Sequence, residues 1–346
     1  MLSLRPLQAY GQRLMGSGQP DLAEGARDQW QLAPGGKRHV PPALHLPGQL
    51  ERIRGTEFAP PEIVMKALRG GYDSLDRPTT AFRVENVDLV DGVLYAKGRQ
   101  RHLRARRSRS LTYRVPREVI SATMYESWLG NRWFGNWLSD DCLTYLLAEP
   151  GSTTVTSLLT PTGHMPRYES LLGMTPLRKD TIHFRELVLF DDMPNNDGKT
   201  QRAAEMRRRL LAGRSCSPLP GVFILRGKSG DARVMENERQ IAEQLAQTYG
   251  FRLLDPMTAS VDQIADLCGE AAIIAGVEGS HLAHGLAMMP PGAALLVFQP
   301  PDRTVAALKT LTDRQNQRYA LVVGEGATTG FTVSWDDVRR TLDLLT

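Results

Sequence analysis

Two short segments of the sequence carry residue types that could bind a phosphate group. The first is a basic loop after the apolar run 221–225, with Arg226, Lys228 and Arg233. The second is a turn of small residues after another apolar run, with Gly276, Gly279, Ser280 and His281. Arginine and lysine supply positive charge to a phosphate, and glycine lets a ligand approach the backbone closely. Together the two segments predict a site for a phosphorylated ligand.

Both segments are expected at one edge of a parallel sheet. In the C-terminal half, apolar runs alternate with helical patterns, which is typical of a doubly wound α/β domain. We expect its strands at 221–225, 251–254, 271–275, 293–298 and 319–323. Such sheets bind ligands beyond the carboxyl ends of their strands, where helix N-termini present free N–H groups. The alternative is that both segments are ordinary connections with solvated basic residues.

Residues 215–300 resemble glycosyltransferase family 61, which includes bacterial capsular polysaccharide biosynthesis proteins. The family typically has two arginines after a strand, an Asn-Glu pair that opens a helix, and then G-x-H-G-A-x-L-x-N. The matching residues are Arg226, Arg233, Asn237, Glu238, Gly276, Gly279 and Leu282. A weaker similarity covers Trp133–Leu147. The sequence departs from the family where Glu278 and Asn136 stand in place of histidines.

The resemblance implies an inverting, metal-independent glycosyltransferase built from two facing Rossmann-like α/β domains, a GT-B-like fold. It would move a sugar from a nucleoside-diphosphate sugar to a glycan or lipid-linked acceptor in surface polysaccharide biosynthesis. No cofactor is implied. The chain contains no Asp-x-Asp, the metal-binding motif of many other glycosyltransferases, which agrees with that reading.

The resemblance also implies roles for the matching residues. Arginines and helix N–H groups can stabilise the charge on a leaving diphosphate, with Lys228 the weaker candidate. Asn237 and Glu238 are expected either to support the arginine loop or to bind a ribose or sugar hydroxyl. An inverting displacement also needs a general base, for which Asp140 is the first candidate, followed by Asp141 and Glu278.

No metal site is predicted. His281 and His284 have the spacing of two ligands on one helical face, but no cysteine or carboxylate stands at a matching distance in the sequence. The motifs of dinucleotide-dependent dehydrogenases and Walker-type NTPases are also missing from the sequence.

The length of 346 residues predicts more than one domain. We expect an N-terminal extension at 1–52 that contains a short amphipathic segment. An acceptor-side α/β domain at 53–214 follows, entered through a β-hairpin at Asp91-Gly92 that makes this portion β-rich. The nucleotide-sugar-binding domain would be 215–346. Three scattered cysteines predict free thiols in a reducing compartment.

Charge is distributed unevenly along the chain. Residues 215–346 contain 11 Lys and Arg against 15 Asp and Glu, while the remainder contains 31 against 23. The densest basic run, Arg99–Arg109, has six arginines. It predicts a solvated edge, or a patch for an anionic acceptor or an anionic membrane. No aromatic residue is interleaved with these arginines, so nucleic acid is not the expected partner.

Two further expectations concern the cellular location of the protein and whether it is an enzyme or a binding protein. With no long apolar run and no signal-peptide pattern, the sequence predicts a cytoplasmic protein that is either free or peripheral at the inner face of the membrane. The two replaced family histidines leave a second class open. In that reading the protein is a non-catalytic scaffold that binds a nucleotide sugar or a glycan.

Overall fold

The computed structural model describes residues 2–14, 21–108, 110–227 and 233–345. The chain forms two compact units. Unit 1 comprises Met1–Gly36 and Arg77–Arg202, and unit 2 comprises Lys37–Asp76 and Ala203–Thr346. Residues 37–76, predicted to be shared between the N-terminal extension and the acceptor-side domain, therefore fold with the C-terminal unit.

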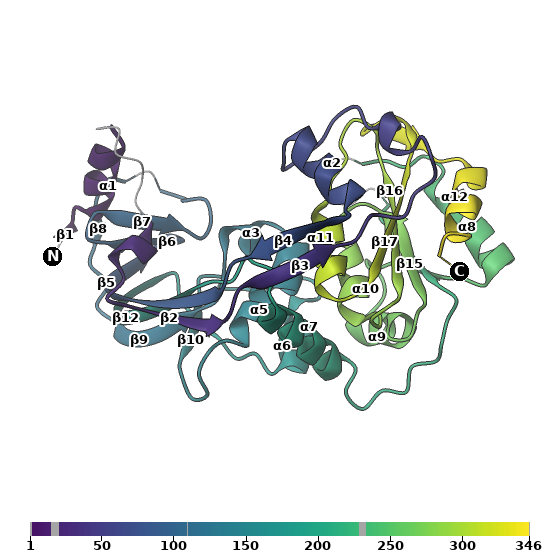
Figure 1. Cartoon of the computed structure of the whole chain (residues 1–346). Coiled ribbons are helices and arrows are strands. Elements are labelled where there is room, and N and C mark those ends of the chain that lie inside the picture. The colour runs from purple at the N-terminus through teal and green to yellow at the C-terminus, as the bar shows by residue number, and fades with distance from the viewer. Residues whose placement is uncertain (1, 15–20, 109, 228–232, 346) are drawn as a thin grey trace. The chain divides into compact units, whose positions relative to one another are not determined.

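Unit 2 is built on a five-stranded sheet in the order β14-β13-β15-β16-β17 (Figure 1). The strands are β13 Val222–Ile224, β14 Arg252–Leu254, β15 Ile273–Val277, β16 Ala294–Gln299 and β17 Arg318–Val323. All four neighbouring pairs are parallel. The predicted parallel sheet is confirmed, and each predicted strand overlaps an observed one. Because the chain visits β13 first, the strand order reverses between β13 and β15, which is where such sheets bind ligands.

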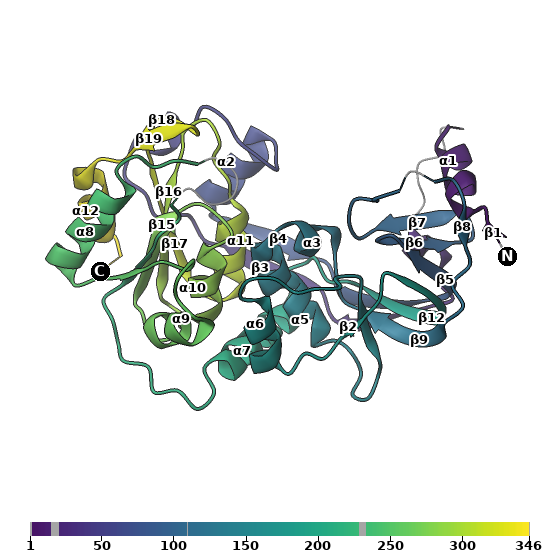
Figure 2. The same cartoon turned by 180° about the vertical axis from the view of Figure 1, so that it is seen from behind.

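Helices cover both faces of this sheet (Figures 1 and 2). One face carries α8 and α12, and the other carries α9, α10 and α11. Their bounds are α8 Glu238–Tyr249, α9 Val261–Cys268, α10 Leu282–Met288, α11 Ala307–Arg314 and α12 Trp335–Leu342. A capping box opens α9, since the Ser260 side chain accepts from the Gln263 N–H and the Gln263 side chain accepts from the Ser260 N–H. Gly250 ends α8 with a φ of 72°.

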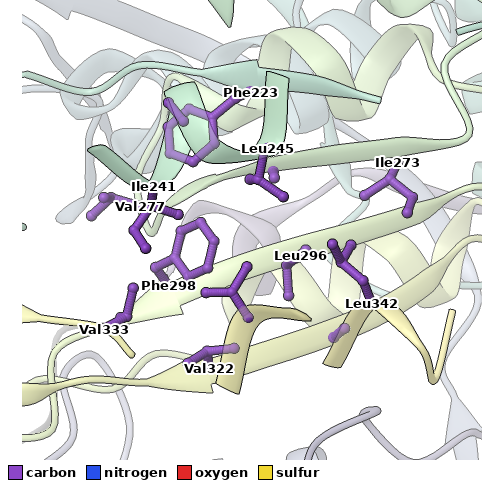
Figure 3. Packing of buried hydrophobic residues seen from close by; sticks show 14 of the residues in the cluster. Phe223, Ile241, Leu245, Ile273, Val277, Leu296, Phe298, Val322, Val333 and Leu342 are labelled. Atoms are coloured by element: carbon purple, nitrogen blue, oxygen red, sulfur yellow. The ribbon is translucent and has the colours of Figure 1, made fainter. Parts of the chain in front are cut away.

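The core of unit 2 lies between the sheet and the α8 and α12 helices (Figure 3). Phe223 and Phe298 stack with their ring centroids 5.8 Å apart. Ile241 and Leu245 reach them from α8, and all four side chains are almost completely buried. Burying one such side chain contributes about 1.5–3 kcal/mol. This packing fixes the strands whose carboxyl ends carry the basic loop and the glycine turn.

Residues 37–76 are closely packed in unit 2. Strands β3 Gly36–Val40 and β4 Tyr72–Asp76 pair with each other, and α2 Pro61–Arg69 lies between them in the chain. The Leu44 N–H donates to the Tyr319 carbonyl at 2.8 Å, and the Leu44 carbonyl accepts from Leu321 at 3.0 Å. Residues 37–52 of the predicted N-terminal extension are therefore a packed part of unit 2. A short pair, β18 Glu325–Ala327 and β19 Gly330–Thr332, completes the unit.

Unit 1 contains an eight-stranded mixed sheet in the order β11-β10-β9-β12-β5-β6-β7, with β2 also paired to β5. The strands are β2 Asp28–Ala33, β5 Thr79–Val90, β6 Val93–Ala96, β7 Arg99–His102, β9 Val119–Met124, β10 Thr154–Thr156, β11 Leu177–Arg178 and β12 Thr181–Asp191. The predicted hairpin is confirmed: Asp91 and Gly92 turn with φ of 50° and 72° between β5 and β6. The β-rich N-terminal part is thus confirmed. The GT-B-like pairing of two domains stays a prediction.

Helical segments of unit 1 lie mostly after β9. They are α3 Trp128–Arg132, α4 Phe134–Asn136, a π-helical turn Trp137–Asp141, α5 Cys142–Tyr145, α6 Met165–Leu172 and α7 Asp197–Leu210, which runs on into unit 2. At the N-terminus, β1 Leu2–Ser3 pairs with β8 Tyr113–Arg114 and precedes α1 Arg5–Leu14. Among the described residues, no helix combines the length and the apolar character needed to span a bilayer.

Candidate functional site

The basic loop and the glycine turn lie side by side in unit 2. Arg226 follows β13, and the turn Gly276–Ser280 begins within β15, the neighbouring strand. Two glycines permit this proximity. A Cβ on Gly276 would lie 2.7 Å from the Ile224 carbonyl oxygen, and a Cβ on Gly279 would collide with Nη1 of Arg226. The two sequence segments therefore form one site at the point where the strand order reverses.

Arg226 is held from both its backbone and its side chain. Its N–H and that of Gly227 donate to the two carboxylate oxygens of Glu238, at 2.7 and 3.0 Å. Its Nη1 lies 3.3 Å from the Glu278 carbonyl oxygen, and the residue is 7% exposed. Burial raises the pKa of Glu238, while the two N–H groups oppose the rise. Glu238 thus supports the arginine loop, one of the two roles predicted for it.

Asn237 also has a supporting position. Its Nδ2 donates to the Val333 carbonyl at 2.8 Å, and its Oδ1 accepts from the Val333 N–H at 3.2 Å. These bonds tie the start of α8 to the segment that precedes α12. With both ends of its amide engaged, Asn237 positions the helix that carries Glu238.

Two more arginines converge on Glu278. Nη1 of Arg233 forms an ion pair with Oε2 of Glu278, and Nη1 of Arg303 lies 3.5 Å from the same oxygen. Arg233 and Glu278 are 8% and 5% exposed. Arg303 was not predicted, although it follows β16 at the same edge of the sheet, which was the one available signal. We call Arg226, Arg233 and Arg303 the arginine cluster; Lys228, also predicted here, lies outside the described residues.

The arginine cluster brings three guanidinium groups together around Glu278. Arg233 and Arg303 contact its carboxylate, Arg226 contacts its backbone carbonyl, and Glu57 lies 4.0 Å from Arg303 at the margin. Burial, followed by Arg233, lowers the pKa of Arg226 to about 10. Burial and then Arg226 hold the pKa of His281 well below its usual value, so this imidazole is neutral at pH 7. An anion that binds here would relieve the crowding of like charges.

The glycine turn offers donors to the same anion. Within the part of the chain that the structure describes, the backbone N–H groups of Gly279 and Ser280 donate no hydrogen bond. The next amides, from Leu282 onward, bond within the helical turn. The turn and the arginine cluster can therefore act together on phosphate oxygens.

A second group of predicted residues lines a cavity of about 650 Å³ in unit 1. Asp140, on the π-helical turn, accepts a hydrogen bond from Lys199 Nζ at 2.9 Å and from Asn136 Nδ2 at 3.2 Å. Lys199 is fully buried. Asn136, which replaces a family histidine, thus positions the carboxylate predicted as the first candidate base.

The other two candidate bases are engaged in structural contacts. Asp141 accepts from the Ser127 N–H at 3.1 Å and from the Ser127 hydroxyl at 2.7 Å. Burial raises the pKa of Asp141 well above its usual range. Glu278 is held between arginines. Asp140, which Lys199 and Asn136 hold at the cavity, stays the first candidate for the general base.

Glu126 was not predicted and also lines this cavity. Its carboxylate accepts from Asn131 Nδ2 at 3.0 Å, the Thr156 hydroxyl at 2.9 Å and the Ser157 N–H at 2.7 Å. Burial raises its pKa despite these bonds. No local pattern marks this residue in the sequence, because two of its three partners, Thr156 and Ser157, lie about thirty residues further along the chain.

Two arginines of the predicted patch Arg99–Arg109 form ion pairs in unit 1. Arg101 pairs with Asp21, and Arg107 lies 2.9 Å from Asp91 and 3.0 Å from Asp180. The Arg107 pair with Asp91 is at the turn of the β5–β6 hairpin. Arg109 lies outside the described residues. Among those described, no group of three or more His, Cys, Asp or Glu side chains is placed to hold a metal ion.

Comparison with known proteins relates part of this chain to one family. No curated protein matches it. The model of the family Glycosyltransferase 61 matches residues 134–296, a span that contains the candidate base Asp140 and, in unit 2, Arg226, Arg233 and the glycine turn. The matched part of the chain therefore belongs to glycosyltransferase family 61.

Proposed function

We propose that this glycosyltransferase takes its sugar from a nucleoside-diphosphate sugar and transfers it with inversion. The observation that carries the proposal is the arginine cluster at the strand-order reversal of unit 2. Three buried or nearly buried guanidinium groups lie close together around Glu278, and burial and the neighbouring Arg233 lower the pKa of Arg226, which a bound diphosphate would counteract. The glycine turn beside it adds N–H donors. These groups can stabilise the leaving diphosphate without assistance from a metal ion.

The reaction would be a single displacement. The acceptor hydroxyl oxygen forms a bond to the anomeric carbon while the bond from that carbon to the diphosphate oxygen breaks. The hydroxyl proton passes to a general base, for which we propose Asp140. Lys199 and Asn136 hold the Asp140 carboxylate in place. The electron pair of the broken bond leaves with the nucleoside diphosphate. The arginine cluster stabilises the negative charge of this leaving group.

The acceptor sugar is proposed to occupy the cavity of unit 1. Acidic side chains outnumber basic ones in its lining, since Asp21, Glu126, Asp140, Asp141, Asp191 and Asp192 face Arg77, Arg101 and Lys199. The exposed part of Trp128 adds an apolar ring surface. This lining favours hydroxyl groups over phosphate. An uncharged sugar unit of a glycan or lipid-linked acceptor fits it better than an anionic group, and assembly of a surface polysaccharide such as a capsule is the proposed context.

Release of nucleoside diphosphate from a panel of sugar nucleotides tests this function. The wild-type chain is expected to release product slowly even without an acceptor, and faster with one. Arg226→Ala should reduce release by at least about a hundredfold, as loss of a group that stabilises the leaving charge does. Arg239→Ala is the matched control, because Arg239 is exposed and forms its ion pair with Glu243 within α8. Equal rates for Arg226→Ala and the control would refute the donor site.

A second candidate function follows from the two replaced family histidines. Asn136 and Glu278 occupy these positions and both serve to hold neighbouring groups, through Asp140 and through Arg233. A protein that binds a nucleotide sugar or glycan without turning it over would show saturable binding by the wild-type chain and no product with any donor. The same panel therefore separates the enzyme from a scaffold.

A further inference from the structure

The N-terminal helix α1 packs with its small side chains and turns its large apolar ones outward. Pro6 and Ala9 are buried against unit 1. On the outer side, the exposed fractions are 65% for Leu2, 52% for Leu4, 43% for Leu7 and 52% for Tyr10. We call these four residues the N-terminal ridge. An amphipathic helix ordinarily buries its large apolar face, so this arrangement leaves a surface that a partner could cover.

The N-terminal ridge is held on the unit through one buried carboxylate. Asp88 is 1% exposed and accepts hydrogen bonds from Arg5 Nη1 and from the Tyr113 hydroxyl, both at 2.7 Å. Nδ1 of His183 lies 2.7 Å from its other oxygen. Arg5 belongs to α1, and Tyr113 belongs to β8, which pairs with β1. The ridge is therefore anchored in this orientation.

Positive charge adjoins the ridge. Leu2 of β1 stands directly opposite Arg114 of β8, and both are exposed, whereas their neighbours Ser3 and Tyr113 turn inward. Residues 97–117 contain nine Lys and Arg and no Asp or Glu, and residues 1–20 contain no acidic residue either. Arg101 and Arg107 form internal ion pairs, but Lys97, Arg114 and Arg117 remain exposed. Figures 1 and 2 show β1, α1 and β8 together at one end of unit 1.

We propose that the N-terminal ridge docks this protein on a lipid surface with anionic headgroups. Leucine side chains next to exposed cations are the combination by which interfacial helices bind such surfaces, the apolar groups entering the headgroup boundary and the cations facing the lipid charge. A second copy of the chain fits less well. A two-fold contact through the ridge would bring the basic segments of both copies together, and like charges would repel.

Docking by so small a surface needs both contributions. A single lipid chain inserted in a bilayer already gives only marginal, reversible binding, and a second signal is required for stable attachment. The four side chains of the ridge are in that regime. Binding should therefore require anionic lipid and should weaken as salt is added, because salt screens the attraction of the exposed cations.

Vesicle co-sedimentation of the full chain tests the proposal. The wild-type protein should bind vesicles of phosphatidylcholine with phosphatidylglycerol and should bind vesicles of phosphatidylcholine alone far less. The double variant Leu4→Gln/Leu7→Gln should bind the anionic vesicles at least about tenfold more weakly, which corresponds to about 1.4 kcal/mol. Arg114→Glu should also weaken binding to the anionic vesicles, and this loss should be larger at low salt than at high salt. The control Leu32→Gln/Leu75→Gln replaces two leucines that are 40% and 82% exposed elsewhere and should bind as the wild type does.

Three results would overturn the proposal. One is a wild-type chain that does not bind anionic vesicles. Another is equal binding by the ridge variant and the control variant, with thermal unfolding showing both folded. The third is a dimer in light scattering that the ridge substitutions dissociate while vesicle binding is absent, which would assign the ridge to a second copy. The proposal does not depend on glycosyl transfer, so none of these outcomes bears on the donor site.

Discussion

The side chain of Arg226 lies against the backbone of Gly279, so closely that a Cβ at position 279 would collide with Nη1. The contact joins the loop after β13 to the turn after β15. It explains why a residue without a side chain stands at position 279, and it makes the position of the guanidinium depend on the turn. The geometry of the arginine cluster is thus set by the backbone as well as by Glu278.

Substitutions at two glycines of the turn should affect ligand binding and stability to different extents. Gly279→Ala should lower the melting temperature modestly, because its φ of 158° is one that residues with a side chain rarely adopt. It should weaken nucleoside-diphosphate binding about tenfold, since Arg226 must leave its position. Gly276→Ala should lower stability by about 1–3 kcal/mol, because its Cβ would lie 2.7 Å from the Ile224 carbonyl, which the sheet holds in place.

Differential scanning fluorimetry and ligand titration check this contrast. Gly36→Ala is the control, because no atom lies within 4 Å of a Cβ at that position. A Gly279→Ala variant that binds the diphosphate with wild-type affinity would show that the contact does not position Arg226.

Asp141→Asn should be tolerated at neutral pH and should gain relative stability as pH rises. The pKa of Asp141 is raised in the folded chain by burial, so its favourable contribution is complete below the unfolded pKa. That contribution is lost as pH rises through the folded pKa, because ionisation of the buried carboxyl then opposes folding. Asparagine has no such titration. Urea unfolding of both proteins at several pH values measures the difference in their free energies of unfolding. A wild-type chain that gains stability relative to the variant as pH rises would contradict this prediction.

Lys199→Met should destabilise unit 1 strongly. Lys199 is fully buried and bonds Asp140, so its removal leaves that carboxylate without its buried cation, at a cost of about 3–5 kcal/mol. The double variant Lys199→Met/Asp140→Asn should recover much of this loss while remaining inactive. Denaturant midpoints measure the first effect and product release the second. Equal midpoints for the single and double variants would show that the two residues are not coupled.

Local patterns in the sequence were sufficient for the C-terminal sheet. Each short apolar run depends only on neighbours in the chain, and each overlaps a strand of the structure as predicted. The helix signals at Gly250 and Ser260 are equally local. The proximity of the loop at Arg226 to the turn at Gly279 also followed, because parallel strands bring their carboxyl ends to one edge.

Features that depend on distant contacts were missed. Residues 37–76 join unit 2 through pairing of Leu44 with β17. No local sequence pattern predicts this pairing, because β17 lies far from Leu44 in the sequence. The same holds for Lys199, which meets Asp140 from another helix, and for Arg303, which reaches Glu278 from the next strand. The amphipathic pattern of α1 could be recognised in the sequence. The buried face of this helix, however, carries the small residues, whereas an amphipathic helix usually buries its large apolar residues.

The most direct test of the donor site is calorimetric titration with nucleoside diphosphates, using the wild type, Arg226→Ala, Arg233→Ala and the control Arg239→Ala. At least one diphosphate should bind the wild type and the control equally. Loss of a charge-assisted bond of about 1.5–3 kcal/mol should weaken its binding to Arg226→Ala about ten- to a hundredfold. Arg233→Ala should behave similarly. Unchanged affinity in both cluster variants, with the fold intact, would contradict the assignment of the diphosphate to this site.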